Sequence, residues 1–314
     1  MGEVLGPVVG DQRASQSESL LLRSLLFVPA HRTDWAHKAA NSGADAVILD
    51  LEDSVPGHLK DDARHATAST IQQLATSHPR LSIFVRLNPT DSQMCGVDIS
   101  ATAVDGLCGY VVPKVHGVRD IIRVEALVEH FEAAHSLSSP LNLIPTFETA
   151  QAYAECEKIA GASHRILTLF AGTARDADGA RSIGFRFTPG GQETLYLRSR
   201  ALLAARAAGC RFPVVGVWQD VGNLQGLRRF ADANRDLGYR GLVVIHPSHV
   251  PVANEVFTPS EAEYTYYSAM LEAFAEAEVD GRAAISFDGE LVDYAHAETA
   301  REVVQLFEAI RNQV

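Results

Sequence analysis

Cysteine is scarce in this chain of 314 residues. The four cysteines, Cys95, Cys108, Cys156 and Cys210, form no C-x-x-C pair, and no cluster of histidines accompanies them. This spacing argues against a structural zinc site, and a chain of this length does not need a disulfide framework to fold. We therefore expect four reduced thiols that are partly buried.

Long apolar runs are also missing. No stretch of about 20 apolar residues is present, which argues against a membrane-spanning helix. The N-terminal segment MGEVLGPVVGDQRASQSES lacks the basic region and apolar run of a signal peptide. We therefore expect a disordered leader over residues 1–20 and a cytoplasmic protein.

Positive charge is in deficit, with 27 Lys and Arg against 39 Asp and Glu, a formal net charge of -12. A surface this acidic repels polyanions, so nucleic acids and anionic membranes are not expected as partners. An anionic small-molecule ligand would need a metal ion or local positive charge to offset this field.

Short apolar runs of strand length recur along the chain. Such continuously apolar segments are typical of parallel strands that are buried on both faces. They cover residues 25–28, 46–51, 82–87, 109–113, 141–146, 166–170, 213–217 and 241–245. Helical patterning lies between them, for example over residues 32–41, 193–208 and 224–237. Strand–helix alternation repeated eight times predicts a (β/α)₈ TIM barrel over residues 21–255. A doubly wound sheet would also fit eight strands, but no G-x-G-x-x-G follows any of them.

Residues 256–314 predict a C-terminal extension. Thr258 is expected to cap a helix that has Pro259 in its first position and Glu261 completing a capping box. A hairpin over residues 282–293, with its turn at Asp288-Gly289, and a last helix over residues 297–310 should follow. Lying beyond the barrel, the apolar residues of this extension should need a covering surface on another subunit. They are Tyr266, Met270, Leu271, Phe274 and Phe287.

Charged residues gather at the C-terminal ends of the expected strands, where TIM barrels hold their active sites. Asp50 and Glu52, two residues apart, share a face. With Glu148 and an aspartate after the sixth strand they form an oxygen-rich pocket, which suits Mg²⁺ or Mn²⁺. The same carboxylates could instead be a buried network paired with Lys114, Arg86 and Lys60.

At this point the chain resembles the HpcH/HpaI aldolase and citrate lyase β-subunit family. The resemblance rests on an ordered set of motifs that runs from residue 23 almost to the end. They are RSLLFVPAHR (23–32), GADAVILDLEDSV (43–55), FVRLN (84–88), VVPKV (111–115), IPTFETA (144–150), VIHPSHV (244–250) and VFTPSEAE (256–263). The resemblance implies a TIM barrel, a divalent metal, usually Mg²⁺, and a homotrimer or hexamer. It also implies C–C cleavage or formation between a CoA ester and an α-keto acid.

Carried over residue by residue, the resemblance makes Glu148 one metal ligand and Arg86 the group that binds the keto acid. The second ligand is an aspartate in FAGTARDADGARSIG (170–184). Counting back from Gly184 gives Asp178 and implies a two-residue insertion, with Asp176 as the alternative. Asp50, Glu52 and Lys114 are candidate substrate-binding residues.

The C-terminal extension supplies one more candidate. Asp293 matches an aspartate that relatives bring to a neighbouring subunit's active site, so it is a candidate acid or base in trans. It could equally be a structural residue ahead of the last helix.

Lys60 and Arg64 share a helix face. They could meet CoA phosphates or pair with Asp50 and Asp53, and we lean to the pairing. Trp35 is expected to be a packing residue.

The expected function is Mg²⁺-dependent retro-Claisen cleavage of a β-hydroxyacyl-CoA, such as malyl-, citramalyl- or citryl-CoA. The alternatives are a citrate lyase β subunit that acts on an acyl-carrier-protein thioester, a metal-dependent pyruvate-type aldolase without a thioester, and a thioesterase or non-catalytic relative.

Overall fold

The computed structural model describes residues 20–312. Its contacts divide the chain into two compact units, with the division between Glu255 and Val256. The expected leader, residues 1–20, lies outside the described residues except for Leu20. In the described range, no helix combines the length and the apolar character that crossing a membrane requires.

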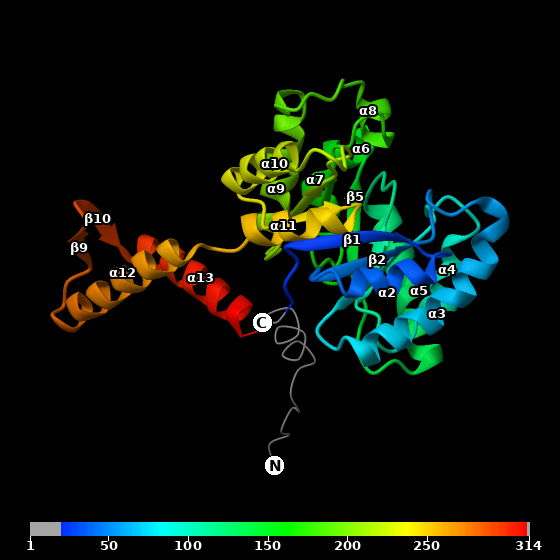
Figure 1. The fold of residues 1–314 in the computed structure, drawn as a ribbon, viewed down its shortest axis with the longest axis horizontal. Helices are drawn as coiled ribbons and strands as arrows, with labels where there is room; N and C mark the ends of the chain where they lie inside the picture. Colours follow the sequence, from blue (N-terminus) through cyan, green and yellow to red (C-terminus); the bar gives the residue numbers. More distant parts are fainter. Residues whose placement is uncertain (1–19, 313–314) are drawn as a thin grey trace, which may run out of the picture. The chain divides into compact units, whose positions relative to one another are not determined.

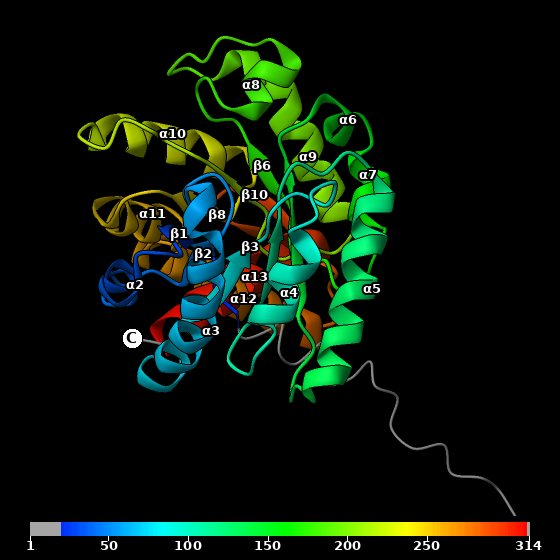
Figure 2. The same cartoon turned by 90° about the vertical axis from the view of Figure 1, so that its right-hand side faces the viewer.

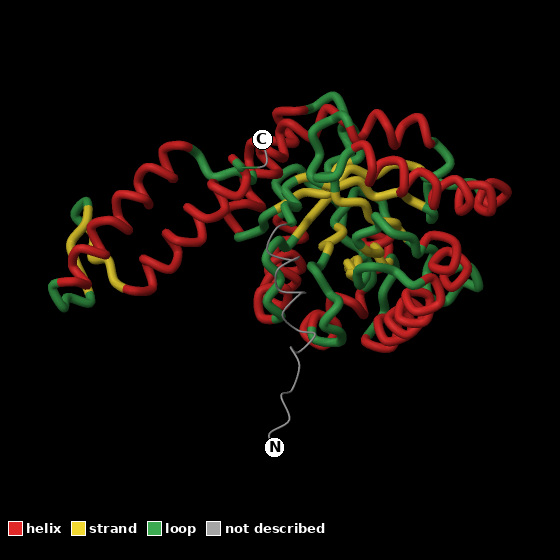
Figure 3. The backbone as a smooth tube through the Cα atoms, turned by 90° about the horizontal axis from the view of Figure 1, so that it is seen from below, coloured by secondary structure: helices red, strands yellow, loops and turns green. Residues whose placement is uncertain are grey.

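The first unit contains a closed barrel of eight parallel strands, and β1 pairs with both β2 and β8. Figure 1 and Figure 3 show these strands inside a layer of helices. The strands are β1 (Ser24–Pro29), β2 (Ala46–Asp50), β3 (Ser82–Arg86), β4 (Gly109–Val112), β5 (Asn142–Phe147), β6 (Phe170–Gly172), β7 (Val214–Gly216) and β8 (Gly241–Val244). The predicted TIM barrel is therefore confirmed.

Helices follow the strands around the barrel. These helices are α2 (Thr33–Ala40), α3 (Lys60–Ser77), α4 (Cys95–Thr102), α5 (Val118–His135), α6 (Ala150–Ala154), α7 (Cys156–Ala160), α8 (Asp178–Ile183), α9 (Leu195–Ala207), α10 (Leu224–Leu237) and α11 (Val250–Val256). Helices α2, α9 and α10 confirm the three helical segments named from the sequence. Every residue of β2 and β4 is buried, because helices cover one face and the barrel interior covers the other.

The sixth strand differs from its prediction. The apolar run over residues 166–170 was expected to be the strand, but regular pairing begins at Phe170 and continues to Gly172. Earlier in the run only Ile166 makes an isolated bridge, to Leu143. Thr168 donates a hydrogen bond from its hydroxyl to the carbonyl of Phe212 at 2.6 Å. An apolar pattern predicts which residues are buried, but it does not predict which of them form the backbone hydrogen bonds of the sheet.

The second unit consists of two helices and a hairpin: α12 (Glu261–Val279), β9 (Ala284–Phe287), β10 (Glu290–Asp293) and α13 (Tyr294–Arg311). The hairpin turn at Asp288-Gly289 is confirmed, and both residues have positive φ. The predicted capping frame is wrong by two residues. Ser260 caps α12 in a capping box with Glu263, because these side chains bond to each other's backbone N–H groups.

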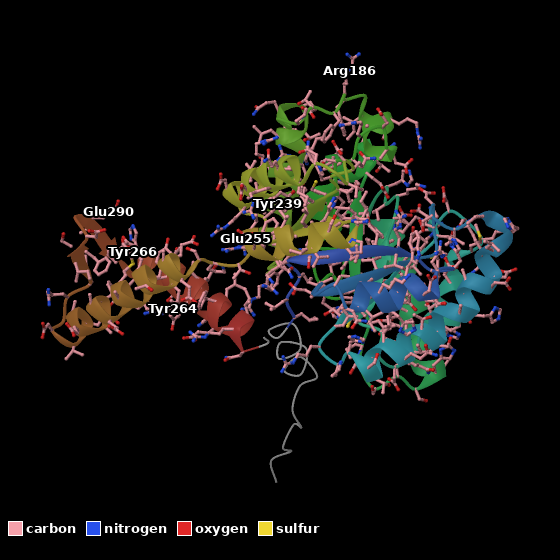
Figure 4. All side chains as sticks on the ribbon, viewed as in Figure 1. Arg186, Tyr239, Glu255, Tyr264, Tyr266 and Glu290 are labelled. Atoms are coloured by element: carbon pink, nitrogen blue, oxygen red, sulfur yellow. The ribbon has the colours of Figure 1, made fainter. Side chains whose placement is uncertain are left out.

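The second unit also covers part of its own apolar surface. Met270 and Phe274 of α12 are buried together with Val292 of the hairpin and Ala297 and Ala300 of α13. Tyr266, Leu271 and Phe287 pack against this cluster, and Figure 4 labels Tyr266 on α12. The expectation that these residues need a second subunit to cover them is therefore wrong for Met270 and Phe274, whereas Tyr266, Leu271 and Phe287 are only partly buried.

Candidate active site

Several of the charged residues expected at the strand ends line a cavity of about 580 Å³. Its lining includes Asp50, Arg86, Glu148 and Asp178. These side chains meet because parallel strands bring their C-terminal ends to the same end of the barrel. Apolar and aromatic residues also line the cavity, among them Phe27, Trp35, Phe170, Val217 and Ile245.

Arg86 is held firmly at the end of β3. The β2–β3 register places Asp50 directly beside it. Its Nε and Nη2 each donate a hydrogen bond of 2.7 Å to one Asp50 oxygen, while its guanidinium lies 4.7 Å from the centre of the Phe27 ring. Burial is the largest single influence and raises the pKa of Asp50, but the Arg86 charge and the hydrogen bonds to the carboxylate together outweigh burial and hold the pKa below its usual value.

Glu52 is the second acid on this guanidinium. Its Oε2 lies 2.8 Å from Nη1 of Arg86, and its Oε1 lies 2.8 Å from Nζ of Lys114. Burial raises the pKa of Glu52 despite these two cations. Asp50, Glu52, Arg86 and Lys114 thus form a network of ion pairs, much as the structural alternative supposed, although Lys60 lies outside the set of direct pairs.

Glu148 follows β5 and accepts a hydrogen bond of 2.8 Å from the backbone N–H of Lys114. Lys114 has a φ of 49°, an uncommon conformation for a residue with a side chain. Burial is the largest cause that raises the pKa of Glu148 to about 7, and the negative charge of Glu52 is the next. Asp178 adds to this repulsion. A carboxylate in such surroundings favours a nearby positive charge.

Asp178 opens α8, and the backbone places it beside Glu148. Gly179 fits here because a Cβ would lie only 2.9 Å from the carbonyl oxygen of Gly172 and 3.7 Å from Cα of Glu148. The Asp178 side chain is 21% exposed, contacts Arg181, and lies 3.5 Å from Nζ of Lys114. Asp176 is exposed, has a φ of 55°, and does not line the cavity.

The residues present fit a divalent cation. Five carboxylates, Asp50, Glu52, Asp53, Glu148 and Asp178, share the site with three cations, Arg86, Lys114 and Arg181. The excess of negative charge is costly in a partly buried site. Within residues 20–312, no group of three or more His, Cys, Asp or Glu side chains forms a ready metal cage. Glu148 and Asp178 with water or ligand oxygens would instead give the donor set that Mg²⁺ usually takes.

Asp293 is the remaining candidate from the sequence. It lies in the second unit, where it caps α13 by accepting hydrogen bonds from the N–H groups of Ala295 and His296. His296 also contacts its carboxylate at 2.7 Å and lowers the pKa of Asp293. Asp293 therefore has a structural role ahead of the last helix, as the alternative held, and a catalytic role in trans stays a proposal.

Two further expectations need correction. Lys60 and Arg64 do not pair with Asp50 and Asp53. Lys60 donates to the carbonyls of Leu51 and Glu52 and to Asn88, whereas Arg64 binds Asp98 and Asp61. Both residues therefore have structural roles. Their position on one helix face could not predict that Lys60 would bond to backbone carbonyls.

Trp35 is not a core residue. It is 44% exposed, lines the cavity, and lies under the Arg32 guanidinium at 4.0 Å. Phe27 was missed altogether, and its place two residues before the end of the first strand was the available signal.

The chain matches the family model described as HpcH/HpaI aldolase/citrate lyase over residues 23–247. Two relatives from Cereibacter sphaeroides each cover 92% of this chain and 95% of their own length. One is a (3S)-malyl-CoA thioesterase, 34% identical, and the other is an L-malyl-CoA/beta-methylmalyl-CoA lyase, 35% identical. Among solved structures, CitE from Mycobacterium tuberculosis in complex with magnesium, acetoacetate and coenzyme A is 26% identical with a TM-score of 0.71. That match covers 93% of this chain and 99% of CitE. On this agreement of sequence and fold, the chain belongs to the HpcH/HpaI aldolase/citrate lyase family.

Proposed function

We propose that this protein is a Mg²⁺-dependent carbon–carbon lyase that cleaves a β-hydroxyacyl-CoA into a CoA ester and an α-keto acid. The observation that carries the proposal is the pair of Glu148 and Asp178, in a cluster with excess negative charge beside Arg86. The lyase relative and the magnesium and coenzyme A in the CitE structure support the same chemistry. Mn²⁺ has similar ligand preferences and should substitute.

Glu148 and Asp178 would hold the ion, which when bound supplies a Lewis acid for the keto-acid oxygens. Arg86 would bind the keto-acid carboxylate, with Asp50 and Glu52 fixing the orientation of its guanidinium. Lys114 would hold Glu52 in place and add positive charge near the substrate. The cavity volume of about 580 Å³ lies within the usual range for small-molecule sites.

The reaction is a retro-Claisen cleavage. The substrate hydroxyl loses its proton and its oxygen becomes the keto-acid carbonyl. The electrons of the C–C bond pass to the leaving fragment as a thioester enolate, and a proton added at the enolate carbon gives the CoA ester. We assign both proton transfers to Asp293 of a neighbouring subunit, whose carboxylate would accept the hydroxyl proton and return it at the enolate carbon.

Thioester hydrolysis is the second candidate, because a relative of equal similarity is a (3S)-malyl-CoA thioesterase. Hydrolysis would release free CoA and a hydroxy acid, and no keto acid. A carrier-protein thioester, a pyruvate-type aldol substrate and a non-catalytic role are alternatives that the same assay addresses.

The test is to incubate purified protein with malyl-, citramalyl- and citryl-CoA and Mg²⁺, and to measure keto acid and free thiol together. A lyase forms keto acid without free thiol, and EDTA abolishes the signal. Free thiol without keto acid would identify a thioesterase. No product from any of the three would count against a CoA-ester lyase.

A further inference from the structure

The segment that leads from β6 to Asp178 has no regular secondary structure. Within residues 173–177 only Arg175 and Asp176 form a turn, and Asp176 has a φ of 55°. Figure 2 shows α8 beyond the end of β6. Thr173 donates its backbone N–H to the carbonyl of Gly216 at 2.8 Å, which fixes the first residue of the segment. The hydroxyl of Ser182 in α8 accepts a hydrogen bond of 2.9 Å from the backbone N–H of Ala150, and the segment itself has a second attachment further along.

Gln219 supplies that second attachment. Its Oε1 accepts a hydrogen bond of 2.6 Å from the backbone N–H of Arg175, and its Nε2 donates one of 3.1 Å to the carbonyl of the same residue. One side chain thus satisfies both backbone groups of Arg175, as a neighbouring strand would do. Any movement of Arg175 would break two hydrogen bonds. Gln219 also lines the cavity that Asp178 lines.

The residues next to Gln219 are themselves fixed. Trp218 is buried, and its indole N–H donates to the carbonyl of Asp220 at 3.0 Å. Its ring lies 6.1 Å from that of Phe187 and 5.9 Å from that of Phe230. Gly226 permits this packing, because a Cβ there would lie 2.3 Å from the Trp218 ring.

Phe187 provides a second link between the segment 173–177 and the residues that follow β7, because it contacts both Arg175 and Trp218. The guanidinium of Arg175 lies 5.1 Å from the centre of the Phe187 ring. Figure 4 shows the adjacent residue, Arg186, pointing outward from the loop after α8. The segment before Asp178 and the loop that follows α8 therefore both attach to the end of β7.

We propose that Gln219 is a positioning residue: it fixes the segment 173–177 so that Asp178 stays beside Glu148, and it thereby sets the affinity for the divalent cation. This inference rests on the proposed function in so far as Glu148 and Asp178 are the metal ligands. Gln219 itself is not assigned a contact with metal or substrate.

The test compares Gln219→Met, which keeps the side-chain length and removes both hydrogen bonds, with Gln225→Met on the exposed surface of α10. Titration with Mn²⁺ should show affinity weakened about three- to tenfold in Gln219→Met and unchanged in Gln225→Met. In an Asp178→Asn background, Gln219→Met should have no further effect, because the two changes act through the same ligand. Wild-type affinity in Gln219→Met, or the same weakening in both backgrounds, would overturn the proposal.

Hydrogen exchange provides a readout that needs neither metal nor substrate. Amides of residues 173–178 should exchange faster in Gln219→Met than in wild type, and Gln225→Met should match wild type. Unchanged exchange in Gln219→Met would overturn the proposed positioning role of Gln219. Faster exchange and weaker Mn²⁺ binding in a protein that cleaves no CoA ester would uphold the positioning role while the lyase proposal fails.

Discussion

Single residues at the barrel rim differ in how their charges are balanced. Asp50 has two hydrogen bonds from Arg86, and Glu52 lies between Arg86 and Lys114. Glu148 instead accepts a backbone N–H, and burial raises its pKa to about 7. Glu148 is therefore a carboxylate whose ionised form is costly unless a cation binds nearby.

This cost should appear in the metal-free protein as a dependence of stability on pH. Between the ordinary value of 4.5 and about 7, the folded state binds more protons at Glu148 than the unfolded state does. The contribution of Glu148 to stability therefore falls as pH rises through this window. The Gln side chain in Glu148→Gln cannot ionise. As pH rises from about 5 to about 8, the free energy of unfolding of this variant should therefore increase relative to that of wild type by ~1 kcal/mol or more.

Urea unfolding in EDTA measures this difference at each pH. A constant difference between Glu148→Gln and wild type across the window would show that Glu148 does not have a raised pKa.

Arg86 should affect both stability and catalysis. Arg86→Lys keeps the charge but loses the two-pronged contact with Asp50, which is buried. We expect a loss of about 1–3 kcal/mol in the free energy of unfolding. We also expect a fall in turnover, and a rise in KM for the keto acid in the synthetic direction. Unchanged kinetics in a folded Arg86→Lys protein would remove Arg86 from substrate binding.

The sequence predicted which charged residues meet, because the ends of parallel strands converge. It could not predict the pairing among them. Asp50 and Glu52 fitted either a metal pocket or a network paired with Lys114, Arg86 and Lys60, and the structure pairs both with Arg86. Lys60 was expected to pair with carboxylates, whereas it bonds to backbone carbonyls. Such choices depend on sub-ångström placement of loops that no residue pattern encodes.

At the scale of elements, the segment between β6 and α8 decides which aspartate faces Glu148. Asp178 lines the cavity, and Asp176 is exposed with a positive φ. We expect Asp178→Asn to weaken Mn²⁺ binding at least tenfold and Asp176→Asn to leave it unchanged. Asparagine suits this comparison because it tolerates positive φ better than alanine does. The reverse result, measured by Mn²⁺ titration, would show that Asp176 is the ligand.

Local patterns predicted the elements well and their ends less well. Strand β8 and helix α10 match their predictions closely because apolar periodicity is strong there. The cap of α12 was misplaced because Thr258 and Ser260 are both good cap residues, each followed by a glutamate three positions on. Contacts elsewhere in the fold decide between such equal local signals.

At the scale of the whole molecule, the second unit has a buried core of its own, yet Val279, Leu291 and Tyr294 are 89%, 70% and 51% exposed. We propose that it packs against another copy of the chain in a homotrimer or hexamer, in which Asp293 serves the neighbouring active site. Asp293→Asn retains an acceptor for the cap of α13 and removes the carboxylate.

Mixing subunits tests this arrangement. Asp293→Asn and Glu148→Gln should each be inactive alone, and hybrids of the two should regain activity, because some sites then receive both intact residues. Mass spectrometry verifies that hybrids have formed. Verified hybrids without activity, or a fully active monomer, would return Asp293 to a purely capping role.

The central claim is that Glu148 and Asp178 hold the divalent ion on which carbon–carbon cleavage depends. The most direct measurement is a Mn²⁺ titration of wild-type and Glu148→Gln protein, with keto-acid formation from the CoA ester followed in the same samples. We expect wild type to bind Mn²⁺ and form keto acid in proportion to occupancy, and Glu148→Gln to lose both. Wild-type Mn²⁺ affinity and metal-dependent cleavage in Glu148→Gln would contradict the account.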